Sequence, residues 1–197
     1  MKERKMSPIE KLESKISFFS NRIFFSLLII AIIGLSIRIL FLHIEIPINS
    51  DNFLYFRSAV DQSVGYFSET HNIANDGWPF FLSLFFSIIP SNNFMDYMAL
   101  QRFLTIGISV LTIIPIYFLS KQFISKQYAV LASAIFAFEP RIAQNSLFGT
   151  TDPLSILALT ISLALIFDKK YYLQYISFAI LSFSILVRSE GLFLLPI

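Results

Sequence analysis

The sequence predicts an all-α, polytopic membrane protein, and three observations lead to that fold class. Of the 197 residues, 55% are hydrophobic and only 14% are charged, whereas about a quarter of a soluble domain is charged. The apolar residues gather in long runs, and Lys and Arg lie mostly between alternate runs. This composition excludes a water-soluble domain, a disordered chain and a fibrous protein. The chain has no cysteine, which excludes disulfides, thiolate metal sites and Cys nucleophiles.

Five apolar segments are predicted to cross the membrane, because a spanning helix needs roughly 20 apolar residues. They are residues 23–42, about 97–119, 128–138 with an extension to 148 left open, 153–167 and 171–187. A sixth apolar segment begins at Gly191, so we expect the chain to be the N-terminal part of a longer protein. The predicted organisation is a cytoplasmic segment, residues 1–22, followed by one transmembrane domain, residues 23–197.

The Lys and Arg residues predict which side of the membrane each segment faces. With the N-terminus in the cytoplasm, ten of them fall inside and only Arg57, Arg141 and Arg188 fall outside. Cytoplasmic segments of membrane proteins carry this excess of Lys and Arg. Nine of the thirteen acidic residues lie on the opposite side. We therefore expect a multi-pass protein with a cytoplasmic N-terminus and an acidic extracytoplasmic face.

One long segment, residues 44–96, lies on the predicted outer side between the first two spans. It contains an apolar stretch from Trp78 to Ile89, whose twelve residues are too few to cross a bilayer. We expect a juxtamembrane helix there, at the outer interface, with Pro79 in its first turn, where a missing N–H costs nothing.

Three polar clusters fall on the same outer side. The first contains Asp51, Asn52, Tyr55 and Arg57, directly after the first span. Asp51 has two interpretations, and the local sequence alone favours the first: a helix N-cap, or a general base held at the membrane boundary. Tyr55 would lie one helical turn from Asp51.

The second cluster, residues 139–153, is predicted to be a polar loop that contains Glu139, Arg141 and Asp152. Asp152 precedes a proline, which is a common helix opening, so a capping role is again the alternative. Glu139 and Arg141 stand in an apolar setting, where charges need partners or a polar cavity.

The third cluster is Arg188 and Glu190 at the outer end of the fifth span, where a snorkelling helix end is the alternative. Taken together, the three clusters predict a site for an anionic lipid head group. Arg141 and Arg188 are the candidate phosphate ligands, because Arg binds phosphate oxygens with two parallel hydrogen bonds. A carboxylate can accept a proton or bind a divalent cation.

The order of several motifs carries a family resemblance from about residue 23 onward. An outer Asp51 is followed by a Tyr, Gly77-Trp78-Pro79 opens an apolar segment, and two later stretches read QNSLFGTTD (144–152) and LVRSEG (186–191). This order resembles the GT-C superfamily of membrane glycosyltransferases, which includes protein O-mannosyltransferases, aminoarabinose transferases and oligosaccharyltransferase catalytic subunits. The resemblance implies transfer of a sugar from a polyprenyl-phosphate donor to a protein, lipid or glycan acceptor on the outer or lumenal face.

The resemblance also implies roles for particular residues. Asp51 takes the place of the first-loop catalytic Asp, and Asp152 that of the second acidic position. The Asp-x-Asp or Asp-Glu pairing of these families reads Asp51-Asn52-Phe53 here, which favours the metal-independent, mannosyltransferase-like branch. A Mg²⁺ or Mn²⁺ ion would have to use Asp51 and Asp152. The supporting candidates are Asn52, Tyr55, Arg57, Glu139 and Glu190.

Two other functions remain open at this point. A transporter would place polar groups in broken helices at the bilayer midplane, whereas the predicted spans here hold almost no ionisable residue. A non-catalytic lipid-handling protein would need the same arginines. Membrane lipids are expected partners in every case, and nucleic acid in none.

Overall fold

The computed structural model describes residues 21–48, 50–67, 75–167 and 170–194, with the backbone alone at residues 21, 50, 51 and 194. The described part is helical and has no strand, as the all-α prediction requires. Its α-helices are α2 (Asn21–Leu40), α3 (Ser50–Ser63), α4 (Gly77–Ile88), α5 (Phe94–Leu111), α6 (Ile113–Ser120), α7 (Lys126–Phe138), α8 (Pro140–Leu147), α9 (Asp152–Ile166) and α10 (Tyr171–Val187). A 3₁₀ helix, η1 (Ser189–Leu194), follows α10.

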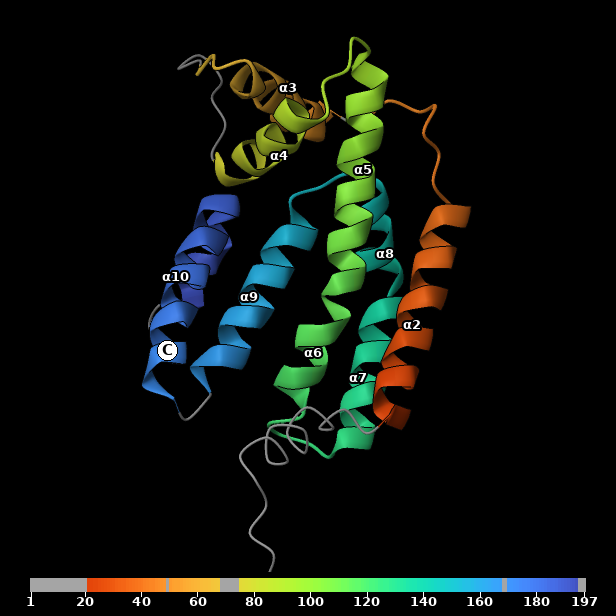
Figure 1. Cartoon of the computed structure of the whole chain (residues 1–197), viewed down its shortest axis with the longest axis vertical. Helices are drawn as coiled ribbons and strands as arrows, with labels where there is room; N and C mark the ends of the chain where they lie inside the picture. The colour runs from red at the N-terminus through yellow and green to blue at the C-terminus, as the bar shows by residue number, and fades with distance from the viewer. Residues whose placement is uncertain (1–20, 49, 68–74, 168–169, 195–197) are drawn as a thin grey trace, which may run out of the picture.

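The long helices run side by side, and α3 and α4 lie across them at one end (Figure 1). Two helices are long and apolar enough to cross a membrane: Arg22–Leu40, and the continuous stretch Phe94–Ser120 formed by α5 and α6. The helices α4, α7, α9 and α10 are apolar but shorter. The predicted cytoplasmic segment lies outside the described residues except at residues 21 and 22.

Proline residues explain where two of the predicted spans divide. In the second predicted span, α5 ends at Leu111 and α6 begins at Ile113, and Thr112 between them keeps helical dihedral angles (φ −62°, ψ −20°). Pro115 lacks an N–H, and its ring conflicts with the carbonyl four residues earlier, at Leu111. The third span ends at Phe138, and Glu139 is extended (φ −64°, ψ 119°) because a residue before proline is pushed out of the helical region.

The prediction of a polar loop over residues 139–153 was wrong in its first half. Pro140 occupies the first turn of α8, where a proline costs nothing, and the helix continues to Leu147. In Figure 1, α8 continues beyond the end of α7, so the two helices together extend the third apolar segment. The extension toward residue 148 that the sequence left open is therefore helical, with a break at Glu139.

The predicted helix over the apolar stretch of the long segment is confirmed as α4, with Pro79 in its first turn. It packs on α3 and on the end of α10. Trp78 and Leu82 are fully buried in this contact, and Phe86 meets Phe56 of α3 with ring centroids 6.0 Å apart. Gly77 lies so close to α10 that an added Cβ would stand 2.6 Å from the backbone carbon of Leu186.

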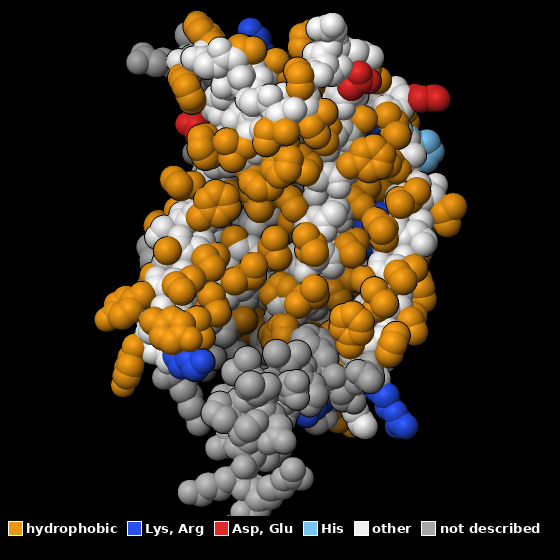
Figure 2. Space-filling view, in the orientation of Figure 1, with side chains coloured by type: hydrophobic (Ala, Val, Ile, Leu, Met, Phe, Trp, Pro, Cys, Tyr) orange, Lys and Arg blue, Asp and Glu red, His pale blue; other side chains and the backbone are white. Residues whose placement is uncertain are grey.

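The bundle buries small polar side chains and exposes large apolar ones. Ser162 and Ser177 join α9 to α10 by mutual hydroxyl and carbonyl hydrogen bonds of 2.9–3.1 Å, and both are buried. The face in Figure 2 is covered along the long helices by hydrophobic side chains. Small polar residues between helices, with apolar residues facing outward, are the packing pattern of helices in lipid.

Candidate functional site

Three of the residues predicted from sequence meet at the end of the bundle where α9 begins and α10 ends. Asp152, the first residue of α9, forms an ion pair through Oδ1 with Nη1 of Arg188. Arg188 also donates from Nη2 to Oε1 of Glu190 at 2.6 Å and from Nε to Oε2 at 3.3 Å. We call Asp152, Arg188 and Glu190 the outer charge cluster.

Asn145 of α8 and Thr150 of the loop after α8 hold Asp152 in place. Asn145 donates from Nδ2 to Oδ2 of Asp152 at 2.6 Å, and the hydroxyl of Thr150 contacts the same oxygen at 3.4 Å. Gly149 has φ +70°, which favours glycine and turns the chain from α8 back toward α9. The cap position of α9 is Thr151, so the capping alternative for Asp152 was wrong. Its carboxylate is oriented for ion pairing instead.

Helix α3 brings Asn52 and Tyr55 of the first predicted cluster to the same place. The buried side chain of Asn52 donates from Nδ2 to the carbonyl of Phe148 at 3.1 Å, which fixes the first turn of α3 on the loop that leads to Asp152. Tyr55 lies near enough to Arg188 to contribute to its electrostatics. Asp51 is the second residue of α3, directly before Asn52; its side chain lies outside the described part of the chain.

The contact between Arg188 and Glu190 shifts the pKa values of both residues. The hydrogen bond from Arg188 lowers the pKa of Glu190 to about 2. The hydrogen bond to Glu190 raises the pKa of Arg188, against the opposing effect of burial, and the charge of Glu190 and nearby Tyr55 add to the increase. The side chains of Asp152 and Arg188 are 24% and 34% exposed, and that of Glu190 is 58% exposed. Arg188 and Glu190 are therefore both charged at neutral pH, and the cluster is open to solvent on the side of Glu190.

The other predicted residues have different surroundings. Glu139 is the N-cap of α8, and its Oε2 accepts from the backbone N–H of Ile142 at 2.7 Å. Arg141 is exposed and lies one helical turn before Asn145, on the same face of α8. Arg57 lines a separate cavity beside Phe53 and Phe94. No described contact joins Glu139, Arg141 or Arg57 to the outer charge cluster.

The surroundings of Asp152 do not suit a divalent cation. Its two oxygens already accept from Arg188, Asn145 and Thr150, and the positive guanidinium would repel a metal ion at the same position. Among the residues that the structure describes, no three Asp, Glu, His or Cys side chains converge as metal ligands.

Sequence reasoning did not single out Asn145 and Thr150, although both lie in the quoted stretch 144–152. A signal was present, because Asn and Thr within a few residues of an acid often hydrogen-bond to it locally. Gln101 was also missed. It is fully buried in α5 and donates from Nε2 to the carbonyl of Gly149 at 2.7 Å, which anchors the loop before Asp152.

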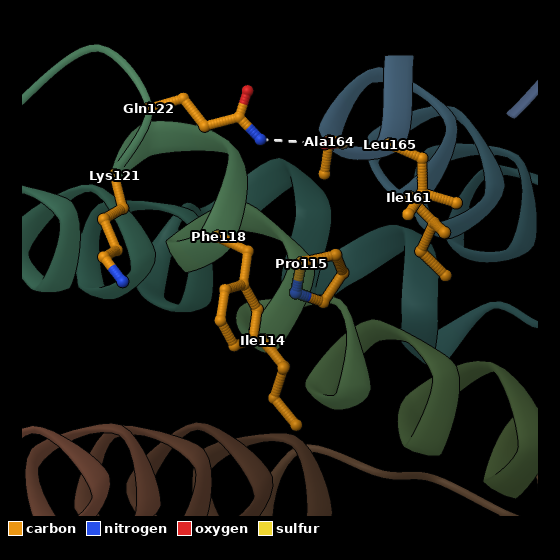
Figure 3. Close-up of a pocket in the computed structure, with 8 residues that line it drawn as sticks. All are labelled: Ile114, Pro115, Phe118, Lys121, Gln122, Ile161, Ala164 and Leu165. Atoms are coloured by element: carbon orange, nitrogen blue, oxygen red, sulfur yellow. Dashed lines mark hydrogen bonds between the residues drawn. The ribbon is translucent and has the colours of Figure 1, made fainter. Parts of the chain in front are cut away.

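A pocket lies at the end of the bundle opposite to the outer charge cluster. It has a volume of about 490 Å³ and lies between α6 and α9 (Figure 3). Its walls are mainly Ile114, Pro115, Phe118 and Ile161, and Gln122 closes one edge by donating to the carbonyl of Ala164 at 2.8 Å. Among the described residues that line it, Lys121 is the one charged residue, and none is acidic.

Comparison of the chain with protein-family models, with curated proteins and with solved structures finds no match.

Proposed function

We propose that the protein is a multi-pass membrane protein with the outer charge cluster on the extracytoplasmic side. The exposed apolar surface and the buried Ser and Thr residues support several crossings. Basic residues lie at the helix ends opposite to α3 and α4: Arg22, Lys121, Lys126 and Lys170. A cytoplasmic location of that end agrees with the bias of Lys and Arg toward cytoplasmic segments.

Labelling of single cysteines in this cysteine-free chain tests the orientation. A membrane-impermeant reagent applied to intact cells should reach Asn92→Cys, between α4 and α5, and should not reach Ile124→Cys, between α6 and α7. Both side chains are exposed, so a difference in labelling reports the side of the membrane rather than burial. Labelling of Ile124→Cys but not of Asn92→Cys, or equal labelling of both in intact cells, would contradict the proposed topology.

We further propose that the protein is a glycosyltransferase of the GT-C type, which transfers a sugar from a polyprenyl-phosphate donor to an acceptor on the outer face. The observation that carries the proposal is the convergence of three distant segments at one end of the bundle. The bond from Asn52 to Phe148 ties the start of α3 to the loop before Asp152, and the Asp152–Arg188 pair ties that loop to the end of α10. These are the segments that carry the resemblance.

The proposed reaction assigns each group one task. Asp51 accepts the proton of an acceptor hydroxyl or amine while that atom attacks the anomeric carbon of the sugar. The bond from the anomeric carbon to the phosphate oxygen breaks, and the polyprenyl phosphate leaves with the bonding electrons. Arg141 is the stronger candidate to stabilise the phosphate, because it is exposed, whereas Arg188 already binds two carboxylates.

The full-length protein in liposomes, supplied with a radiolabelled polyprenyl-phosphate sugar, tests the function. Transfer of label to a peptide, lipid or glycan acceptor supports a glycosyltransferase, and release of free polyprenyl phosphate should accompany it in equal amount. Movement of the intact donor across the bilayer without cleavage would identify a transporter. Tight donor binding with neither outcome would identify a lipid-handling protein.

A further inference from the structure

Two arginines lie buried in the bundle without a carboxylate partner among the described residues. Arg38 of α2 is 1% exposed and Arg102 of α5 is 3% exposed. Neither takes part in an ion pair with a described residue. A buried charge is costly unless an opposite charge or a polar network compensates it.

Arg38 is held by hydrogen bonds to neutral groups. Its Nη1 donates to the carbonyls of Gly34 and Ala137, both at 3.0 Å. Its Nε and Nη2 donate at 3.1 Å to the hydroxyls of Ser146 and Ser109. These bonds fix the guanidinium at the junction of α2, α5, α7 and α8, and all four acceptors are neutral groups.

Arg102 is less completely satisfied. Its two terminal nitrogens donate to the carbonyls of His43, at 2.6 Å, and of Ile46, in the chain that follows α2. Its Nε is buried and has no hydrogen-bond partner. An unpaired buried donor on a charged group costs more than an unpaired neutral donor.

Each arginine lines a cavity, and the two cavities adjoin. The first, of about 410 Å³, lies between α2, α7 and α8 and is apolar apart from Arg38 and Gln144. The second, of about 390 Å³, is lined by Arg102, His43 and Gln144 together with apolar residues. Both cavities share Phe41, Gln144 and Leu147.

The cavities lie at the end of α2, where a lipid head group would meet the hydrocarbon if α2 crosses the membrane as proposed. Helix α2 has 20 residues, about 30 Å of helix, which matches the hydrocarbon thickness. Its last turn and the residues after it, Ile37 to Ile46, form one wall of the cavities. The second cavity, with Arg102 and His43, faces the chain beyond the end of α2, and the first cavity, with Arg38, faces the last turns of α2.

We propose that these adjoining cavities bind the phosphate of a lipid, with Arg102, His43 and Gln144 at the phosphate and its apolar chain against Phe41, Leu147 and Phe138. An anion supplies the negative charge that the two arginines lack among the described residues. An apolar chain suits the first cavity, which a free phosphate would leave empty. The proposal does not depend on glycosyl transfer, since it concerns a site separate from the outer charge cluster.

Native mass spectrometry of the detergent-solubilised protein tests the site with four probes: a polyprenyl monophosphate, phosphatidylglycerol, a neutral polyprenol and inorganic phosphate. We expect both phosphate-bearing lipids to stay bound, and the polyprenol and the free phosphate to be lost. A preference for the monophosphate would identify a donor-type lipid as the source, and equal retention would identify ordinary phospholipid; either result supports the site. Equal retention of the neutral polyprenol would overturn it.

Two substitutions locate the site. Gln144→Glu is isosteric at an exposed position shared by both cavities, and it places a negative charge beside the arginines. It should weaken phospholipid binding by about tenfold, since it repels the phosphate and takes its place, and it should raise the Tm of the lipid-free protein. Arg102→Gln should weaken lipid binding by a similar factor. If Arg102→Gln does not fold, Gln144→Glu alone still tests the site.

Lys170→Gln is the matched control, because it removes a positive charge at the opposite end of the bundle. It should retain the lipids as the unmodified protein does. Loss of binding in this control equal to that in Gln144→Glu would show that charge anywhere on the surface suffices, and would overturn the site. Unchanged binding in Gln144→Glu would overturn it as well.

Discussion

The carboxylate of Asp152 and the guanidinium of Arg188 form an ion pair that joins the first residue of α9 to the residue directly after α10. The two helices form an antiparallel hairpin (Figure 1), and Ser162 and Ser177 connect them further along. The pair therefore fixes the end of the hairpin that faces α3 and α4. Both of its side chains are partly exposed, so its strength depends on how far solvent screens it.

A double-mutant cycle measures this pair. Asp152→Asn keeps the size of the side chain and removes its charge, and Arg188→Gln removes the other charge. We expect a coupling of about 1 kcal/mol in the free energy of unfolding in mixed micelles, at the upper end for solvent-exposed pairs. The same cycle between Asp152→Asn and Lys170→Gln should give a coupling near zero. Additive effects for Asp152 and Arg188 would show that the ion pair contributes nothing.

Gly77→Ala should destabilise the contact between α4 and α10. The new Cβ would meet the backbone of α10 at 2.6 Å from the carbonyl carbon of Leu186 and 2.7 Å from the nitrogen of Val187, and backbone atoms cannot rotate away. We expect a loss of about 1–3 kcal/mol, typical of overpacking. Gly107→Ala in α5 is the control, because no atom lies within 4 Å of its Cβ position; it should be neutral or stabilising by up to about 1 kcal/mol. Equal effects of the two variants on the Tm would contradict the close approach.

Acid should weaken the outer charge cluster through Glu190. Its pKa is about 2 in the folded protein against an ordinary value of 4.5, so the charged form stabilises the folded state above pH 4.5. That contribution is lost as the pH falls from 4.5 toward 2. The Tm of the unmodified protein should therefore fall more between pH 6 and pH 3 than that of Glu190→Gln. Parallel pH profiles would show that Glu190 has an ordinary pKa in the folded protein.

Asp51→Asn should abolish sugar transfer while the protein still folds. Asn suits the start of a helix about as well as Asp, so α3 should form normally. Loss of a general base costs a factor of about 10²–10⁴ in rate. The measurement is the transfer rate per membrane-inserted full-length protein, with folding checked by Tm. A rate within about threefold of the unmodified protein, a small part of that factor, would return Asp51 to a structural role.

Arg141→Ala should raise the KM for the polyprenyl-phosphate donor and leave the Tm nearly unchanged, because the side chain is exposed. Loss of a charge-assisted hydrogen-bonded contact to phosphate weakens binding by roughly ten- to a hundredfold. Arg188→Ala should instead lower the Tm, since that residue binds Asp152 and Glu190. An unchanged donor KM in Arg141→Ala would place the phosphate elsewhere.

The sequence by itself determined most of the apolar helices, because the signals for them are local. The apolar runs around α2, α9 and α10, and a proline at the first turn of α4, predict helices without knowledge of any neighbour. Pro115 and Pro140 are also local signals for helix breaks, but these two breaks were not predicted from the sequence. Residues 140–147 were predicted as a loop, since their polarity conceals a helix with one narrow apolar face.

Only the tertiary structure decided which polar residues meet. Asp152 and Glu139 look alike in sequence, as acids beside a proline, yet one pairs with Arg188 and the other caps α8. Likewise, nothing local shows that Arg38 and Arg102 lie buried and line two adjoining cavities. The physical reason is that ion pairs and buried charges depend on how helices distant in the chain pack together. Local propensity sets where each helix begins and ends, but not which helix it faces.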